Sequence, residues 1–139
     1  MEEGISRTRI AADPGERFVP LRRQLGVTTF GLNQIVLEPR QRGRIHRHER
    51  QEEVYLVLEG TLTVLVEGEE QVLEAGELIR IAPDLRRQLV NAGVERVVLV
   101  ALGGEGEHRG RDGEAFVDWD QERGAPPQET PAPEDLPAD

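Results

Sequence analysis

The chain has 139 residues, enough for one domain with its own core, and it has no cysteine, which excludes disulfide bonds and cysteine-based zinc sites. Its formal net charge is −10 and its 17 basic residues are all arginine, a balance that disfavours nucleic acids and anionic membranes as partners. No apolar run could span a bilayer, and the first residues lack a signal-peptide pattern, so we expect a cytoplasmic protein.

Short strands separated by turn residues dominate the chain as far as residue 102, after a polar arm over residues 1–16. β-Branched residues are dense in the middle of this region, which favours strands over helices. The expected strands are Arg17–Leu25, Thr28–Leu37, Arg44–His48, Glu53–Leu58, Thr61–Glu67, Glu70–Glu74, Glu77–Ile81, Arg86–Asn91 and Arg96–Leu102. Many short strands without a long helical period predict an all-β sandwich or barrel over residues 17–103.

The sequence changes character after this region. Residues 104–124 are charged, and we expect them to pack on the barrel as an extension, with Ala115–Trp119 as a single helical turn. Residues 125–139 hold five of the nine prolines and four acidic residues without a base. Such a segment has too little to bury, so we expect a disordered tail.

Two of the expected strands are apolar on both faces. Leu56 and Tyr55 point to opposite sides of one strand, and Val97–Leu102 is apolar throughout. A strand of this kind must be covered on both sides. In so small a domain we expect the second cover to come from another copy of the chain, which predicts a homodimer.

His46 and His48 are separated by one residue within an expected strand, so their side chains share a face. If the chain turns through residues 49–51 and returns as a neighbouring strand, Glu53 can join them. Two imidazoles and a carboxylate form a facial triad, which suits a divalent transition metal ion with open coordination positions. The alternative is a pair of histidines in a polar cavity without a metal ion.

A cluster of basic residues surrounds these histidines. The favoured interpretation is that the cluster forms a solvated surface and pairs with acidic neighbours such as Glu49 and Glu52. The alternative is a basic rim that attracts an anionic small molecule. The cluster consists of Arg40, Arg42, Arg44, Arg47 and Arg50.

The spacing of His46, His48, Glu53 and Gly60 resembles the first motif of the cupins, although the glycine that usually opens this motif falls at Arg40. The resemblance covers about residues 18–102. It implies a double-sheet jelly-roll barrel that holds one divalent metal ion, which could be iron, manganese, nickel, copper or zinc. Cupin activities range from dioxygenases and isomerases to non-enzymatic storage or sensing, so the motif does not identify a substrate.

The second cupin motif is similar at its ends, Gly76 and Asn91, but is altered between them. The position where cupins supply a further histidine is occupied by Arg87. A guanidinium has no lone pair and cannot bind a cation. Three arrangements remain open: Arg87 reaches over the cavity to hold an anionic substrate, Gln88 turns inward as a weak fourth ligand, or the metal is lost and Arg87 pairs with Glu53.

Besides Arg87, two residues are candidates for substrate binding. No residue of the chain is assigned a catalytic role. The hydroxyl of Tyr55 could reach the cavity, and Asn91 shares a strand face with Arg87. The favoured function is a small metal-dependent enzyme, oxygenase-like or isomerase-like, acting on an anionic small molecule. The alternatives are a non-catalytic module that binds or senses a small molecule or metal, and a metal-free isomerase with His46 or His48 as general base.

Overall fold

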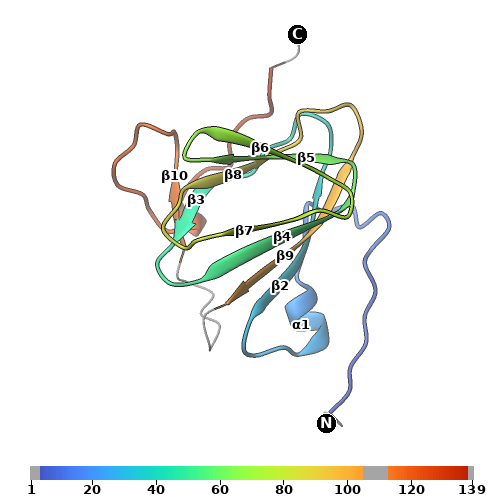
Figure 1. Ribbon diagram of the computed structural model, residues 1–139. Coiled ribbons are helices and arrows are strands. Elements are labelled where there is room, and N and C mark those ends of the chain that lie inside the picture. Colours follow the sequence, from blue (N-terminus) through green and yellow to red (C-terminus); the bar gives the residue numbers. More distant parts are fainter. Residues whose placement is uncertain (1–3, 105–112, 138–139) are drawn as a thin grey trace.

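The structure is a computed structural model that describes residues 4–104 and 113–137. Two five-stranded antiparallel sheets face each other (Figure 1). The first contains, in spatial order, β1 (Phe18–Val19), β2 (Gly31–Leu37), β9 (Val97–Gly104), β4 (Glu52–Glu59) and β7 (Leu78–Ile81). The second contains β10 (Gly113–Phe116), β3 (Ile45–His48), β8 (Arg87–Val90), β5 (Thr61–Val66) and β6 (Glu69–Glu74). This arrangement confirms the predicted double-sheet jelly roll.

The core lies between the inward faces of the two sheets. Tyr55 and Val57 of β4 point inward from the first sheet, and Leu62 and Val64 of β5 belong to the same buried cluster from the second. Side chains alternate along a strand, so the inward face that carries Tyr55 and Val57 also carries Glu53. The apolar pattern of β4 therefore positions an acidic side chain at one end of the barrel interior.

The histidines and the acid come from facing sheets. β3 lies between β8 and β10 in the second sheet, whereas β4 lies between β7 and β9 in the first. The expectation that the chain returns after His48 as a neighbouring strand is therefore wrong. The connection through residues 49–51 crosses from one sheet to the other, and Glu53 meets the histidines across the barrel interior.

The expected strand Arg17–Leu25 is only partly correct. Its beginning forms β1, but residues after Pro20 form a short helix, α1 (Leu21–Leu25). Proline is well tolerated at the start of a helix, and Gly26 ends this one in the left-handed conformation at a φ of 77°. Within the described residues, no helix has the length and apolar character that crossing a membrane requires.

The expected helical turn at Ala115–Trp119 is wrong. Residues Gly113–Phe116 instead form β10, which pairs antiparallel with β3 and places Ala115 opposite His46. Ala115 and Phe116 are both buried. Without β10, β3 would be the edge strand of its sheet, with unpaired backbone N–H and C=O groups. β10 pairs with these groups, and a local sequence pattern cannot predict such a contact between distant segments.

The C-terminal segment, expected to be disordered, lies against the barrel over residues 125–137 and includes a short 3-10 helix, η1 (Pro127–Glu129). Its contacts are made mainly by backbone carbonyls. Arg44 donates to the carbonyl of Thr130 at 2.8 Å, Arg42 to that of Glu134 at 2.7 Å and Arg40 to that of Pro137 at 2.5 Å. The composition of the segment could not predict these contacts. They join its backbone carbonyls to arginines that lie far away in the sequence.

Gly60 lies in close contact with the backbone at Arg96, and its substitution tests how much this close packing contributes to stability. Its φ is +81°, and a Cβ there would lie 2.3 Å from the carbonyl oxygen of Arg96. We expect Gly60→Ala to lower the free energy of unfolding by at least about 3 kcal/mol, because it combines backbone strain with a steric clash. Gly68→Ala is the matched control, since its φ is +83° with nothing within 4 Å. It should cost only about 1 kcal/mol in urea denaturation, and equal losses in the two variants would contradict the expectation.

Candidate metal centre

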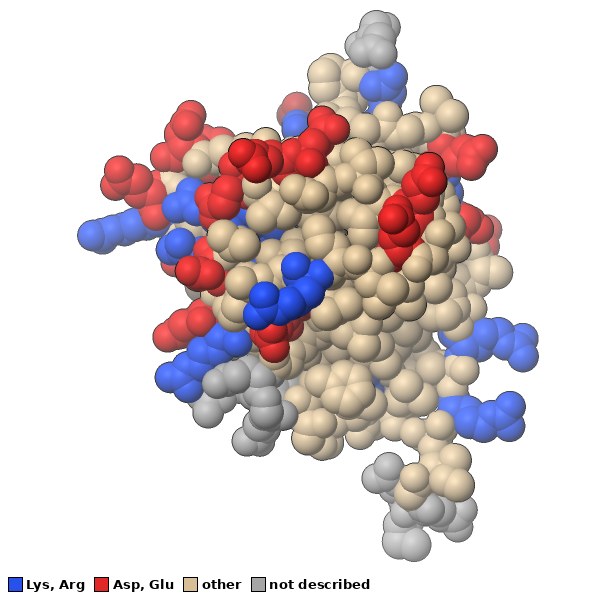
Figure 2. Space-filling model, in the orientation of Figure 1, with Lys and Arg blue, Asp and Glu red and all other residues tan. Residues whose placement is uncertain are grey.

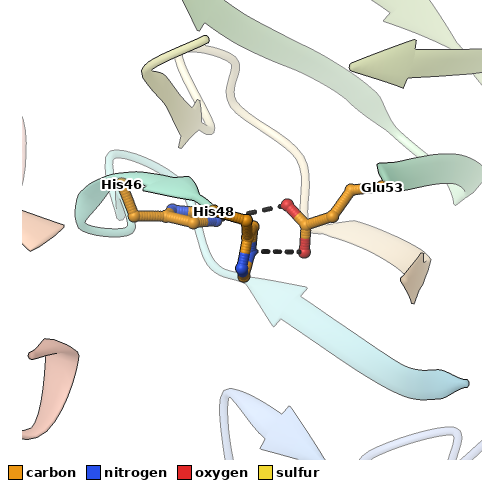
Figure 3. Close-up of side chains that lie close together, drawn as sticks. All are labelled: His46, His48 and Glu53. Atoms are coloured by element: carbon orange, nitrogen blue, oxygen red, sulfur yellow. Dashed lines mark hydrogen bonds and ion pairs between the residues drawn. The ribbon is translucent and has the colours of Figure 1, made fainter. Parts of the chain in front are cut away.

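His46, His48 and Glu53 converge inside the barrel, as Figure 3 shows. Their potential ligand atoms all lie within 4.8 Å of one another. The Nε2 atom of His46 is 3.3 Å from Oε1 of Glu53, and Nε2 of His48 is 3.3 Å from Oε2 of the same carboxylate. The two imidazole rings stand edge to face with centroids 5.3 Å apart. The structure therefore brings together the three residues that the sequence singles out.

The surroundings of His46 fit a metal ligand. Its Nδ1 atom faces the carbonyl oxygen of Arg44 at 3.2 Å, and its Nε2 atom faces Glu53. A metal ion bound at Nε2 would leave an Nδ1–H group to donate to this carbonyl. A bond from Nδ1–H to a backbone carbonyl is the usual way in which a protein orients a histidine ligand. The donor set and its orientation fit a divalent transition metal ion.

Glu53 accepts hydrogen bonds from two further residues. The hydroxyl of Tyr55 donates to Oε1 at 2.6 Å, and the guanidinium of Arg87 donates to the same oxygen at 3.2 Å. Burial raises the pKa of the Glu53 carboxyl, but the hydrogen bonds and charges of His46 and His48 outweigh it, so this pKa lies well below its usual value. Burial, and then the charge of Glu53, raise the pKa of Tyr55 well above its usual value. Glu53 is thus held as a carboxylate and Tyr55 as a donor.

Arg87 lies behind the carboxylate. Its side chain is fully buried, and besides Glu53 it donates to the carbonyls of Ala82 at 2.6 Å and Pro83 at 3.3 Å. It does not contribute to the wall of the cavity beside the triad. The arrangement in which Arg87 reaches over the cavity to hold a substrate is therefore wrong. The structure instead contains the Arg87–Glu53 ion pair of the third arrangement, and metal analysis of the purified protein tests whether this pair excludes the ion.

The structure contradicts two other sequence-based candidates. Gln88 lines a separate pocket on the other side of its strand and donates Nε2 to the carbonyl of Gly43 at 3.0 Å, so it does not turn inward as a ligand. Asn91 is fully buried, with its amide donating to the carbonyls of Leu37 and Glu95. Its oxygen accepts from the backbone N–H of Gly93, so Asn91 holds loops together and does not line the cavity beside the triad.

A cavity of about 370 Å³ adjoins the triad. This volume is within the range of small-molecule sites, ~300–1,000 Å³. Besides the triad and Tyr55, its walls include the apolar residues Phe18, Ile35, Leu37, Leu89, Pro127 and Ala132 and the cations Arg17 and Arg44.

Sequence reasoning missed two contributions to this cavity: that of Arg17, and that of the C-terminal segment through Pro127 and Ala132. Neither leaves a local signal, because both reach the cavity through tertiary packing. Arg44 did carry a signal, since it is two residues before His46 and therefore on the same strand face.

Solved structures with similar folds include a cupin protein from Bacteroides fragilis, at 27% identity and a TM-score of 0.68, with 78% of this chain and 92% of that chain covered. A sugar phosphate isomerase of the cupin superfamily from Silicibacter pomeroyi has 23% identity and a TM-score of 0.59, with 73% and 69% covered. The cupin domain of an XRE family transcriptional regulator from Enterobacter cloacae has 24% identity and a TM-score of 0.58, with 65% and 98% covered. No curated protein matches the sequence significantly.

The family model of the cupin domain matches residues 33–103, about half of the chain. This span runs from β2 to β9 and contains the three clustered residues and Arg87. The His-His-Glu cluster is typical of a cupin metal site, and the two facing antiparallel sheets are those of a cupin jelly roll. The chain belongs to the cupin family.

Proposed function

We propose that the chain is a metal-dependent enzyme that binds one divalent transition metal ion through His46, His48 and Glu53 and acts on a small molecule in the adjoining cavity. The observation that carries this proposal is the position of the three donors on the wall of a cavity of about 370 Å³. Three protein ligands leave coordination positions open for water or substrate. When bound, the ion would supply a Lewis acid or an oxygen-binding centre.

The residues around Glu53 keep the site ready for a cation. Tyr55 and Arg87 both donate to Oε1, which fixes the plane of the carboxylate relative to the two imidazoles. Preorganised donors and charges of this kind reduce the reorganisation that accompanies binding. We assign Tyr55 and Arg87 to positioning Glu53.

A metal-free isomerase with His46 or His48 as general base would keep its activity after a chelator removes the metal, whereas the proposed enzyme would lose it. A binding or sensing module remains the second candidate, because a regulator's cupin domain has a similar fold. A ligand that binds the metal-loaded protein and stays chemically unchanged by NMR would favour sensing over catalysis.

Metal analysis of protein purified without a histidine tag tests the site directly. We expect about one equivalent of a divalent transition metal in the wild type, and less than about a tenth of an equivalent in His46→Ala and Glu53→Gln, which lack one of three donors. Glu52→Gln is the matched control, because Glu52 is exposed and pairs with Arg80 on the outside of the barrel. It should retain the metal, and a wild type without metal would refute the proposal.

The substitution Arg87→His tests how the guanidinium of Arg87 affects metal affinity. Arg87 is paired in register with His46, so an imidazole at this position would stand beside the other donors. The substitution removes a positive charge close to the ion and adds a lone pair, so we expect metal affinity to rise by at least about tenfold. Competition against a chelator measures this change. Unchanged or weaker affinity in a folded variant would show that Arg87 does not limit metal binding.

We also propose that the chain forms a homodimer through the outer face of β4 and β7. Leu56 pairs with Leu78 on this face, Leu78 is 63% exposed and Leu58 is 41% exposed. Figure 2 shows uncharged side chains over much of the middle of the view, with a blue and a red group among them. Exposed apolar surface of this kind is typical of a subunit contact.

Light scattering coupled to size-exclusion chromatography tests this contact. We expect twice the chain mass of 15.5 kDa for the wild type and the chain mass for a Leu56→Glu, Leu78→Glu double variant. Val72→Glu, an exposed apolar residue on β6 of the other sheet, should remain a dimer. A monomeric wild type, or a double variant that stays dimeric, would exclude this interface.

A further inference from the structure

Two arginines line the metal-site cavity, and neither is the arginine of the altered motif. Arg17 and Arg44 both contribute to its wall, whereas Arg87 is buried behind Glu53. We propose that Arg17 and Arg44 bind the carboxylate or phosphate group of the small molecule that occupies this cavity. The inference rests on the proposed function, because the same molecule would also contact the metal ion held by His46, His48 and Glu53.

The backbone places both guanidiniums at this cavity. Arg44 directly precedes β3 and shares the strand face of His46 and His48, so its side chain lies on the side of the metal donors. Arg17 directly precedes β1, and its carbonyl accepts from the backbone N–H of Val36 in the neighbouring strand. Both positions are therefore fixed by sheet pairing.

Each guanidinium is held by a backbone carbonyl. Arg17 donates from Nη1 to the carbonyl of Arg42 at 3.1 Å, which lies two residues before Arg44 in the chain. Arg44 donates from Nε to the carbonyl of Thr130 at 2.8 Å. A guanidinium has five N–H donors, so one bond to a carbonyl fixes its orientation and leaves donors for a ligand.

Among the described residues, ion pairs with carboxylates are formed by Arg47, Arg80, Arg87 and Arg96. Arg17 and Arg44 are instead held by backbone carbonyls, as are Arg42 and Arg86, but of these four only Arg17 and Arg44 line the metal-site cavity. Across residues 4–104 and 113–137, no carboxylate lies within ion-pair distance of Arg17 or Arg44. The chain has 27 acidic residues against 17 basic ones, so carboxylates are plentiful. Two cations beside a cavity, with no counterion among the described residues, point to an anionic ligand.

The chemistry of the wall limits what this ligand is. The planar fork of a guanidinium matches the paired oxygens of a carboxylate or phosphate. Much of the remaining wall is apolar, with Phe18, Ile35 and Leu89 as examples, and contacts the carbon skeleton. A cavity of about 370 Å³ has the size of a small-molecule site. The ligand class is a small organic acid or phosphate ester whose other end carries oxygens for the metal ion.

Isothermal titration calorimetry on the metal-loaded full chain tests the assignment. The probes are fructose 6-phosphate, malate and adipate, with fructose, 1,2,4-butanetriol and 1,6-hexanediol as their neutral counterparts. We expect at least one anionic probe to bind and its neutral counterpart to bind at least about tenfold more weakly, since charge-assisted hydrogen bonds are lost. The phosphate and carboxylate probes separate the two forms of oxyanion.

The variants Arg17→Gln and Arg44→Gln should each weaken binding of that probe by about tenfold or more, while Arg17→Lys and Arg44→Lys keep part of the affinity. Arg42→Gln is the matched control. Arg42 also anchors the C-terminal segment, through the carbonyl of Glu134, but it lines the other pocket, so its loss should leave binding unchanged. Metal content is measured on every variant and should not change.

Three results would overturn the assignment while leaving the proposed function intact. They are a metal-loaded protein that binds none of the anionic probes, a neutral counterpart that binds equally well, and a loss of affinity in Arg42→Gln as large as in the other two variants. Absence of metal from the wild type is a different outcome, because it would refute the proposed function itself.

Discussion

The carboxylate of Glu53 is mostly buried, and a buried charge is tolerated only where opposite charges and hydrogen bonds surround it. Its side chain is 14% exposed, and it is contacted by two imidazoles, a phenol and a guanidinium. These partners come from β3 and β8 in one sheet and from β4 in the other. At this end of the barrel the sheets are therefore joined by polar contacts, whereas Val57 and Leu62 join them through apolar packing further along.

Arg87, in place of the histidine usual in cupins, changes both the number of metal ligands and the charge at the site. A histidine at that position would add a lone pair for the ion, whereas the guanidinium adds a positive charge and competes with the ion for Glu53. Its bonds to the carbonyls of Ala82 and Pro83 hold this charge on the far side of the carboxylate from the cavity. The cation is thus part of the support of Glu53 and cannot itself meet a ligand in the cavity.

The sequence predicted the barrel and the identity of the clustered residues because both depend on local spacing. Alternation along β4 places Glu53 on the face of Tyr55 and Val57, and one intervening residue places His46 and His48 together.

What spacing could not predict depends on contacts between distant segments. The orientation of Arg87 is set by carbonyls before its own strand, and β10 forms because the edge of β3 is available. The C-terminal segment is ordered by arginines about ninety residues earlier. Composition describes that segment alone and therefore predicted disorder.

The charges around the cavity fit an anionic ligand. A divalent ion at the triad, together with the guanidinium of Arg87, would carry more positive charge than the single carboxylate of Glu53 can neutralise. Arg17 and Arg44 add to this excess on the same cavity. A neutral ligand would leave this excess positive charge without a counterion beside the triad. An anion placed between the ion and the two guanidiniums would balance both, so a chain with a net charge of −10 can still select for anionic ligands at this one place.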